Sequence, residues 1–223
     1  VEHCSKVMAG KAFTGTAASE RFFKENAGSF RILHLAMHAE SNDENPVLSR
    51  LIFSNETDTS EDNFLNAYEI YNMQLSADLA VLSACNTGSG KLVRGEGVMS
   101  LANAFSYAGC PSILMSLWKA NDETTADVIT HFFEGIKREK TSSRALQEAK
   151  VRYLENADEL TAHPYFWANL VIIGDDVPLS VKKAGVRWVW LLIGGLGLLV
   201  AVFVLRSSTT VSYTHLRAHE TSE

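Results

Sequence analysis

Cysteine is scarce in this chain, and its three copies, Cys4, Cys85 and Cys110, include no closely spaced pair. A disulfide framework uses an even set of cysteines, and a cysteine-rich zinc site uses closely spaced pairs. Neither kind of site is therefore expected, and a reducing compartment is the more consistent setting.

Basic charge is also in short supply. The 223 residues carry 20 lysines and arginines against 26 acidic residues, which gives a net charge of -6. Binding to nucleic acid generally needs a clustered basic face, and none is visible, so we expect no direct contact with nucleic acid. A hydrophobic fraction of 46% with 21% charged residues is ordinary for one globular domain with a sizeable core.

An initiating methionine is missing, and the chain opens within a pattern, at Val1-Glu2-His3-Cys4. We therefore expect a fragment of a longer protein. The absence of an N-terminal signal then carries little weight.

Charge is absent altogether from residues 188–205, which are apolar on every side. At about 1.5 Å per residue, such a helix comes close to the lower limit for crossing a hydrocarbon core of roughly 30 Å. A buried core helix is the alternative, but it would need only one apolar stripe. The flanks suit a membrane span whose preceding domain faces the cytoplasm, because more basic residues precede it than follow it: Lys182, Lys183 and Arg187 against Arg206.

The sequence thus predicts a single-pass membrane protein with four parts. They are a folded domain at 1–178 whose N-terminus is truncated, a basic juxtamembrane linker at 179–187, a transmembrane helix at 188–205, and a polar tail at 206–223 that is artefactual and has no fold.

Within residues 1–178, apolar runs alternate with amphipathic ones. Strands are predicted at 30–37, 79–83, 112–117 and 169–173, and helices at 17–25, 97–108, 124–138 and 143–156. This alternation favours an α/β fold with a parallel, doubly wound sheet. The acidic segment 42–62 is expected to form an excursion, such as a hairpin, over the carboxyl edge of that sheet.

Two of the predicted strands end in residues capable of chemistry, His38 and Cys85. Open α/β sheets bind ligands at the carboxyl ends of their strands. An ordinary thiol is mostly protonated at neutral pH, so a nucleophilic cysteine needs a neighbouring base, and His38 could supply it. His34 shares the same strand face by even spacing. Only position favours His38, because it ends the run while His34 lies inside it.

The alternative for Cys85 is a buried structural thiol, which is a common state of a free cysteine. Cys110, in Ala-Gly-Cys-Pro before an apolar strand, is expected to be structural. The small-residue loop 86–90 after Cys85 offers backbone N–H groups that could stabilise an oxyanion.

Several motifs resemble the CHAT domain, a family placed with the caspase, legumain and separase group of cysteine peptidases. They occur in order between about Phe13 and Gly174: His-Leu-Ala-Met-His at 34–38, Val-Leu-Ser-Ala-Cys-Asn-Thr-Gly at 81–88, Gly-Glu-Gly-Val at 95–98, Ala-Phe-Ser-Tyr-Ala-Gly-Cys-Pro at 104–111, Ser-Leu-Trp-Lys-Ala-Asn-Asp at 116–122 and His-Pro-Tyr-Phe-Trp-Ala at 163–168.

This resemblance implies a caspase-like three-layer sandwich with a mostly parallel central sheet. It also implies a cysteine endopeptidase that acts on a protein or peptide substrate without metal or organic cofactor. His38 and Cys85 would be the catalytic dyad, and the N–H groups of Ala39 and Cys85 would form the oxyanion hole. In the family, the residue after this histidine is usually Gly, where the chain has Ala39. A regulatory N-terminal region, such as TPR repeats, is implied for the full-length protein.

Asp122 has two readings. Its segment is similar to a separase stretch in which an acidic residue receives a basic P1 side chain, which would make Asp122 a substrate-binding residue. It could instead be the N-cap of the next helix, since Asp often accepts from free helix N–H groups.

Two functions follow as expectations. The first is a membrane-anchored cysteine endopeptidase that faces the cytoplasm, and both His38 and Cys85 favour it. The second is a catalytically inactive CHAT module that docks partners at the membrane, which Ala39 favours.

Overall fold

The computed structural model describes residues 1–42, 44–54, 61–83, 100–118 and 121–179. Residues 1–181 form one compact unit, which contains all of the described residues.

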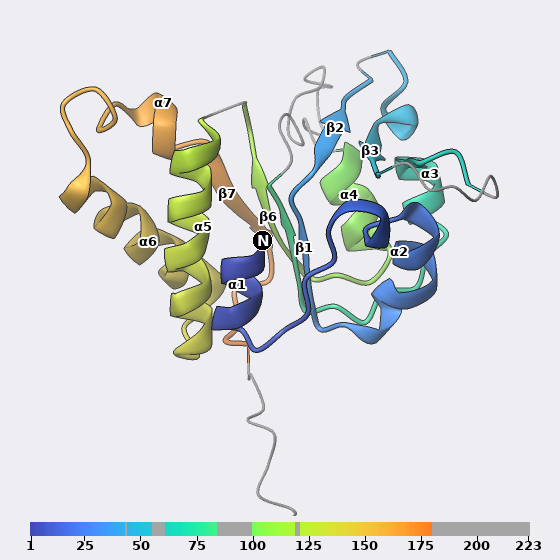
Figure 1. The fold of residues 1–223 in the computed structure, drawn as a ribbon, viewed down its shortest axis with the longest axis horizontal. Coiled ribbons are helices and arrows are strands. Elements are labelled where there is room, and N and C mark those ends of the chain that lie inside the picture. The colour runs from blue at the N-terminus through green and yellow to red at the C-terminus, as the bar shows by residue number, and fades with distance from the viewer. Residues whose placement is uncertain (43, 55–60, 84–99, 119–120, 180–223) are drawn as a thin grey trace, which may run out of the picture. The chain divides into compact units, whose positions relative to one another are not determined.

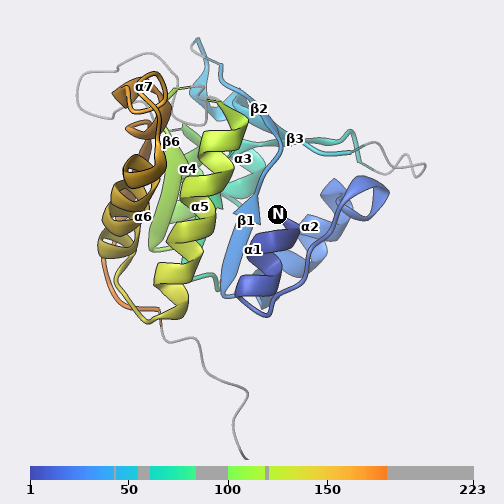
Figure 2. The ribbon, with the colours of Figure 1, turned by 60° about the vertical axis from the view of Figure 1, so that its left-hand side comes forward.

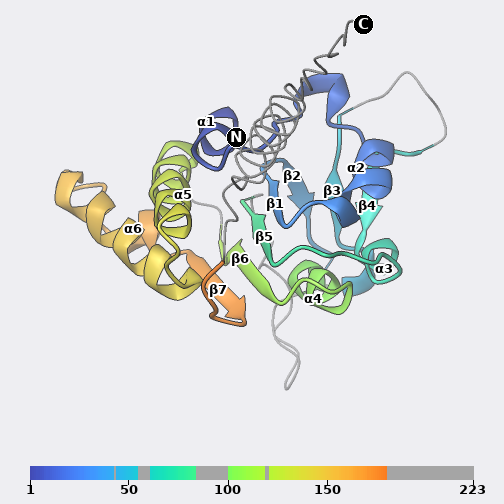
Figure 3. The same ribbon diagram turned by 90° about the horizontal axis from the view of Figure 1, so that it is seen from below.

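The central sheet has four strands in the order β1-β5-β6-β7, which lie side by side in Figure 3. They are β1 (Ile32–Leu35), β5 (Leu79–Leu82), β6 (Ser112–Ser116) and β7 (Leu170–Gly174). The first three are parallel, and β7 is antiparallel to β6. Every residue of β5 and β6 is buried, as expected for strands covered on both faces. The predicted α/β fold with a mostly parallel sheet is confirmed.

The direction of β7 differs from the predicted parallel arrangement. Two helices, α5 (Asp122–Lys137) and α6 (Ser142–Asn156), separate it from β6. One helix would return the chain to the amino edge of the sheet, whereas two bring it back to the carboxyl edge. The short helix α7 (Pro164–Trp167) then leads into β7, which must run in the opposite direction (Figure 1).

Helices cover both faces of this sheet (Figure 2). On one face lie α5, α6 and α1 (Glu2–Val7), and on the other lie α2 (Glu20–Asn26), α3 (Ala67–Ile70) and α4 (Ser100–Tyr107). A hydrophobic core lies on each face of the sheet, and alternate residues of β5 belong to different cores. Leu79 and Val81 pack with α5 and α6, whereas Ala80 and Leu82 pack with α2, α3 and α4. The described residues therefore form three layers, with the sheet in the middle.

A second sheet carries three antiparallel strands in the order β2-β3-β4. They are β2 (His38–Glu40), β3 (Arg50–Ile52) and β4 (Phe64–Asn66). Leu51 and Leu65 are fully buried and join the core on the α4 side. A hairpin was expected within 42–62, but the described part of that segment carries a single strand, β3, whose partners β2 and β4 lie outside it. Three short 3-10 helices complete the fold: η1 (Gly15–Ala17), η2 (Ala27–Ser29) and η3 (Pro46–Leu48).

The predicted single-pass membrane localisation requires a correction. Among the helices in the described residues, none is both long and apolar enough to cross a bilayer. The predicted span at 188–205 lies outside the described residues, as do the tail at 206–223 and all of the 179–187 linker except Leu179. The structure does not support the membrane localisation, and that prediction is withdrawn.

Candidate functional site at the carboxyl edge

The carboxyl ends of β1 and β5 lie side by side. Leu35 and Leu82, the last residues of these strands, are partners in the parallel register. The Ser83 N–H donates to the Leu35 carbonyl oxygen at 3.1 Å and extends the pairing by one step. His38 follows three positions after Leu35. Cys85 follows three positions after Leu82 and lies outside the described residues.

His38 begins a new strand in the second sheet. The chain leaves the central sheet after Leu35, and β2 starts at His38, opposite Ile52 of β3. The side chain of His38 is exposed, as is that of Glu40 on the same face of β2. The strand expected at 30–37 is therefore shorter than predicted and ends at Leu35.

Glu40 is fixed by its partner across the strand pair. The Arg50 guanidinium contacts the Glu40 carboxylate through two nitrogens, at 2.6 and 2.8 Å. The same guanidinium lies 4.0 Å from the centre of the Phe64 ring. Both nitrogens contact the same Glu40 oxygen, and together with the cation–π contact they link the three strands of the sheet that carries His38.

Ala39 points its methyl group inward and its amide outward. The methyl group packs against the core on the α4 side. The Phe53 N–H donates to the Asn63 carbonyl oxygen at 2.9 Å, so the backbone N–H of Phe53 points toward β4. The N–H and C=O groups of every second residue point to the same side of a strand, so those of Leu51 also point toward β4. Ala39 pairs with Leu51, so its N–H points to the outer edge of β2, which no strand of the described residues pairs with.

His34 lies within β1 and contacts Ser83 and Phe133. Its Nε2 is 3.1 Å from the Ser83 Oγ, and its ring lies 5.3 Å from that of Phe133 in α5. Burial lowers the pKa of His34 to about 4, so the ring is neutral at neutral pH. The even spacing that made His34 and His38 equivalent in the sequence does not apply, because they lie on strands of different sheets.

Asp122 is the first residue of α5, but it is not the N-cap. Asn121 holds that position, and its side-chain oxygen accepts from the N–H groups of Glu123 at 2.8 Å and Thr124 at 3.2 Å. The N-cap reading of Asp122 is therefore wrong. The Asp122 side chain is exposed in the first helical turn, where the helix dipole favours negative charge.

The segment between β6 and α5 is anchored by contacts that the sequence pattern does not predict. The Trp118 indole N–H donates to the Tyr165 carbonyl oxygen at 2.9 Å. The side-chain amide of Asn169 donates to the Trp118 carbonyl oxygen at 3.3 Å, and the Leu117 N–H donates to the Asn169 carbonyl oxygen at 2.8 Å. These contacts hold the start of the segment that leads to Asp122 against α7 and β7.

The three-layer fold and the edge described above can be compared with known proteins. The sequence model of the CHAT domain family matches residues 3–175 of this chain. The chain belongs to the CHAT domain family. This family is part of the caspase-like clan of cysteine peptidases. Similar curated proteins are Tetratricopeptide repeat protein 28 of Homo sapiens, 31% identical, and of Mus musculus, 28% identical, each over 116 residues. These matches cover 52% of this chain but only 5% of either relative.

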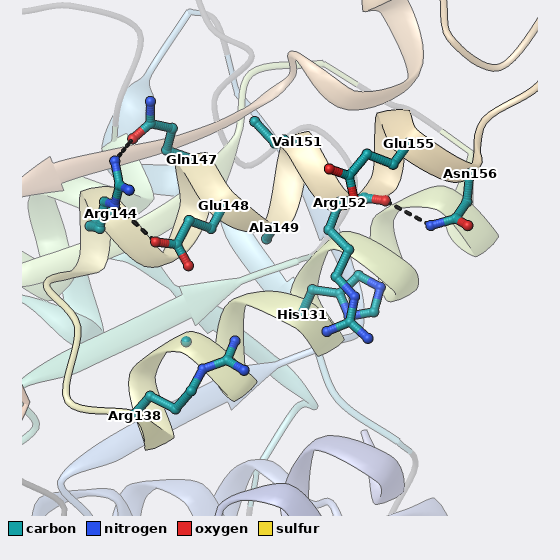
Figure 4. Close-up of a pocket in the computed structure, with 11 residues that line it drawn as sticks. His131, Arg138, Arg144, Gln147, Glu148, Ala149, Val151, Arg152, Glu155 and Asn156 are labelled. Carbon is teal, nitrogen blue, oxygen red and sulfur yellow. Dashed lines mark hydrogen bonds and ion pairs between the residues drawn. The ribbon is translucent and has the colours of Figure 1, made fainter.

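Figure 4 shows a cavity in this CHAT domain that is lined by residues of α5 and α6 and by Arg138. It measures about 430 Å³, and its lining includes the ion pair of Arg144 with Glu148. None of His38, Ala39 and Asp122 lines it. We therefore place the candidate site at the carboxyl edge. In the described part of the chain, no group of three or more His, Cys, Asp or Glu side chains is arranged to hold a metal ion.

Proposed function

We propose that this CHAT domain is a cysteine endopeptidase in which Cys85 is the nucleophile and His38 its base. The observation that carries the proposal is the Leu35–Leu82 pair, since each of these strand ends precedes one member of the dyad by three positions. The carboxyl ends of adjacent parallel strands are the usual place for ligands in open α/β sheets. The exposed His38 side chain suits a base that must reach both thiol and substrate.

The proposed reaction has two halves. In the first, His38 takes the thiol proton as the Cys85 sulfur attacks the carbonyl carbon, and it then gives that proton to the leaving amine. In the second, His38 takes a proton from water, which attacks the thioester, and the thiol regains a proton as the acid product leaves. No metal or organic cofactor takes part.

Ala39 and Cys85 would supply the N–H groups that hold the oxyanion. The direction of the Ala39 amide, toward the outer edge of β2, supports this assignment. The methyl group that distinguishes Ala39 from the usual Gly packs into the core, away from that edge. Because the methyl group lies away from the oxyanion site, Ala39 in place of Gly is a weaker argument against catalysis than the sequence alone indicates.

Asp122 would bind a basic P1 side chain. Its carboxylate is exposed, and the capping of α5 is done by Asn121, so the carboxylate is not needed for that role. The substrate class that follows is a protein or peptide with Arg or Lys before the cleaved bond.

The relatives named as tetratricopeptide repeat proteins support a further part of the proposal. In the full-length protein, a TPR or other sensor region would regulate the peptidase. Protein partners would then act through that region.

Cleavage of a fluorogenic peptide panel with Arg, Lys, Asn or Asp at P1 tests the activity. The expected result is cleavage that His38→Ala and Cys85→Ala each abolish. His3→Ala and Cys110→Ala are matched controls, because His3 is an exposed histidine elsewhere and Cys110 is a buried thiol whose pKa burial raises to about 11. Cleavage that survives Cys85→Ala would sink the assignment.

An inactive interaction module is the second candidate, and one surface favours it. Large apolar side chains are exposed on the neighbouring elements η3, α3 and α4: Val47, Leu48, Tyr68 and Tyr107, the last 77% exposed. If the cellular role of the full-length protein survives Cys85→Ala but not Leu48→Ser, the domain acts by docking. The opposite pattern supports the peptidase.

A further inference from the structure

A side-chain hydrogen bond joins the two strands beside the proposed dyad. The His34 Nε2 and the Ser83 Oγ are 3.1 Å apart, and the same Oγ lies 3.4 Å from the Leu35 carbonyl oxygen. The Leu35 oxygen also accepts from the Ser83 N–H at 3.1 Å. Ser83 is thus tied to both a side chain and the backbone of β1 at the point where β5 ends.

The geometry selects one arrangement of the protons. If the Ser83 hydroxyl donates to the Leu35 carbonyl oxygen, its oxygen is free to accept from a His34 Nε2–H. A neutral imidazole with its proton on Nε2 satisfies this requirement. Burial keeps the imidazole in its neutral form at neutral pH, because it lowers the pKa of His34 to about 4.

Packing alone does not account for a histidine at this position. The ring lies against Phe133, on the face of the sheet that Leu79 and Val81 share with α5. Burying a polar ring in such a place costs free energy unless it is hydrogen-bonded, whereas a Phe or Leu would carry no such cost. The distinctive contribution of the imidazole is therefore its bond to Ser83.

We infer that His34 and Ser83 form a positioning pair, which holds the ends of β1 and β5 at the separation that the His38–Cys85 dyad needs. This inference rests on the proposed peptidase function. Ser83 precedes Cys85 by two positions, and His34 precedes His38 by four. Each partner of the hydrogen bond therefore lies shortly before one of the proposed catalytic residues in the sequence. Neither His34 nor Ser83 contacts substrate in this account.

The test uses variants that remove the bond while keeping the packing. His34→Phe keeps a ring against Phe133, Ser83→Ala removes only the hydroxyl, and the double variant removes both partners. His34→Gln can place an amide N–H near the position of Nε2 and is the rescue variant. Ser112→Ala is the matched control, because it removes a buried hydroxyl, bonded to Ser142 at 3.4 Å, from the amino end of β6.

Two experiments are made on the intact protein. The first measures kcat and KM for peptide cleavage. The second measures the rate of Cys85 alkylation by iodoacetamide across pH 5 to 9, with the site identified by mass spectrometry. Small displacements of reacting groups can cost large factors in rate, so we expect each single variant to lower kcat about tenfold with little change in KM. The double variant should match the singles, since both remove one interaction. His34→Gln and Ser112→Ala should retain most of the wild-type kcat.

Wild-type kcat in both single variants would overturn the inference, as would a double variant that multiplies the two losses. The alkylation profile separates this outcome from failure of the proposed function. If His34→Phe and Ser83→Ala keep the wild-type kcat while His38→Ala changes the profile, the dyad stands and the positioning role fails. If His38→Ala leaves the profile unchanged, the dyad itself fails and the inference with it.

Discussion

Leu35 of β1 pairs with Leu82 of β5 in parallel register, and the chain leaves the central sheet directly after Leu35. His38 then opens a separate sheet whose outer edge carries the Ala39 amide. One pair of buried leucines thereby relates the proposed base and oxyanion donor to the end of β5, from which Cys85 follows in sequence.

The stability of the domain should fall as the pH drops from about 6.5 to about 4, because of His34. Its pKa is lowered from 6.5 to about 4 in the folded state, so the folded state resists protonation that the unfolded chain accepts. Above about pH 6.5 the domain keeps its full stability with respect to His34, and by pH 4 the free energy of unfolding has fallen by at most about 3 kcal/mol. Urea unfolding at pH 7, 5.5 and 4 measures it. His34→Phe should show a shallower pH dependence, and an identical slope in both proteins would contradict the assignment.

Lys24→Met should destabilise the domain by about 2 kcal/mol, because it leaves partly buried carboxylates without their cation. The Lys24 ammonium lies 2.7 Å from Glu20, 2.9 Å from Glu61 and 2.8 Å from Glu69. Glu20 is 1% exposed, and burial raises its pKa. Chemical denaturation measures the loss.

The matched control for Lys24 is an exposed ion pair. Arg31 contacts Asp78 at 2.6 Å, but both side chains are well exposed. Arg31→Met should therefore cost less than about 1 kcal/mol. Equal losses in the two variants would show that burial of Glu20 does not set the cost.

Gly135→Ala should destabilise the domain by about 1 to 3 kcal/mol through overpacking. A methyl group at residue 135 would lie 2.8 Å from the Ala145 Cβ, where α5 packs on α6. Ala145→Gly in the same chain should restore much of the stability. Thermal unfolding of the single and double variants checks this, and a neutral Gly135→Ala would mean that the two helices can move apart freely.

The residues at the start of α5 should separate stability from specificity. Asn121→Ala should cost about 1 kcal/mol, because the helix loses its cap. Asp122→Asn should leave unfolding nearly unchanged, and under the proposed function it should raise KM for P1-Arg peptides. An unchanged KM for Arg and Lys substrates would remove Asp122 from the P1 site.

The parts of the fold that the sequence could predict are those where local pattern and burial agree. β5 and β6 are buried on both faces, so they appear as unbroken apolar runs. The two long helices between β6 and β7 were also visible in the pattern. Their number already implied an antiparallel β7, which the expectation of a parallel sheet overlooked.

The candidate site was less accessible to sequence reasoning. Ala36 and Met37 continue the apolar pattern of β1, although the strand has ended at Leu35, so His34 and His38 looked equivalent. The direction of the Ala39 amide depends on pairing with Leu51, a contact that no local pattern encodes. Asn121, by contrast, could have been chosen as the cap, since Asn is a preferred N-cap residue and directly precedes the helix.

Irreversible labelling by an electrophilic peptide probe with Arg at P1 tests the peptidase assignment most directly. Wild type, His38→Ala and Cys85→Ala are compared in the full-length protein, and mass spectrometry identifies the labelled residue. We predict labelling at Cys85 that is lost in His38→Ala. If probes with Arg, Lys, Asn and Asp all fail to label Cys85 while iodoacetamide still reaches it at the same rate in wild type and His38→Ala, the dyad is inert and the domain is not a peptidase.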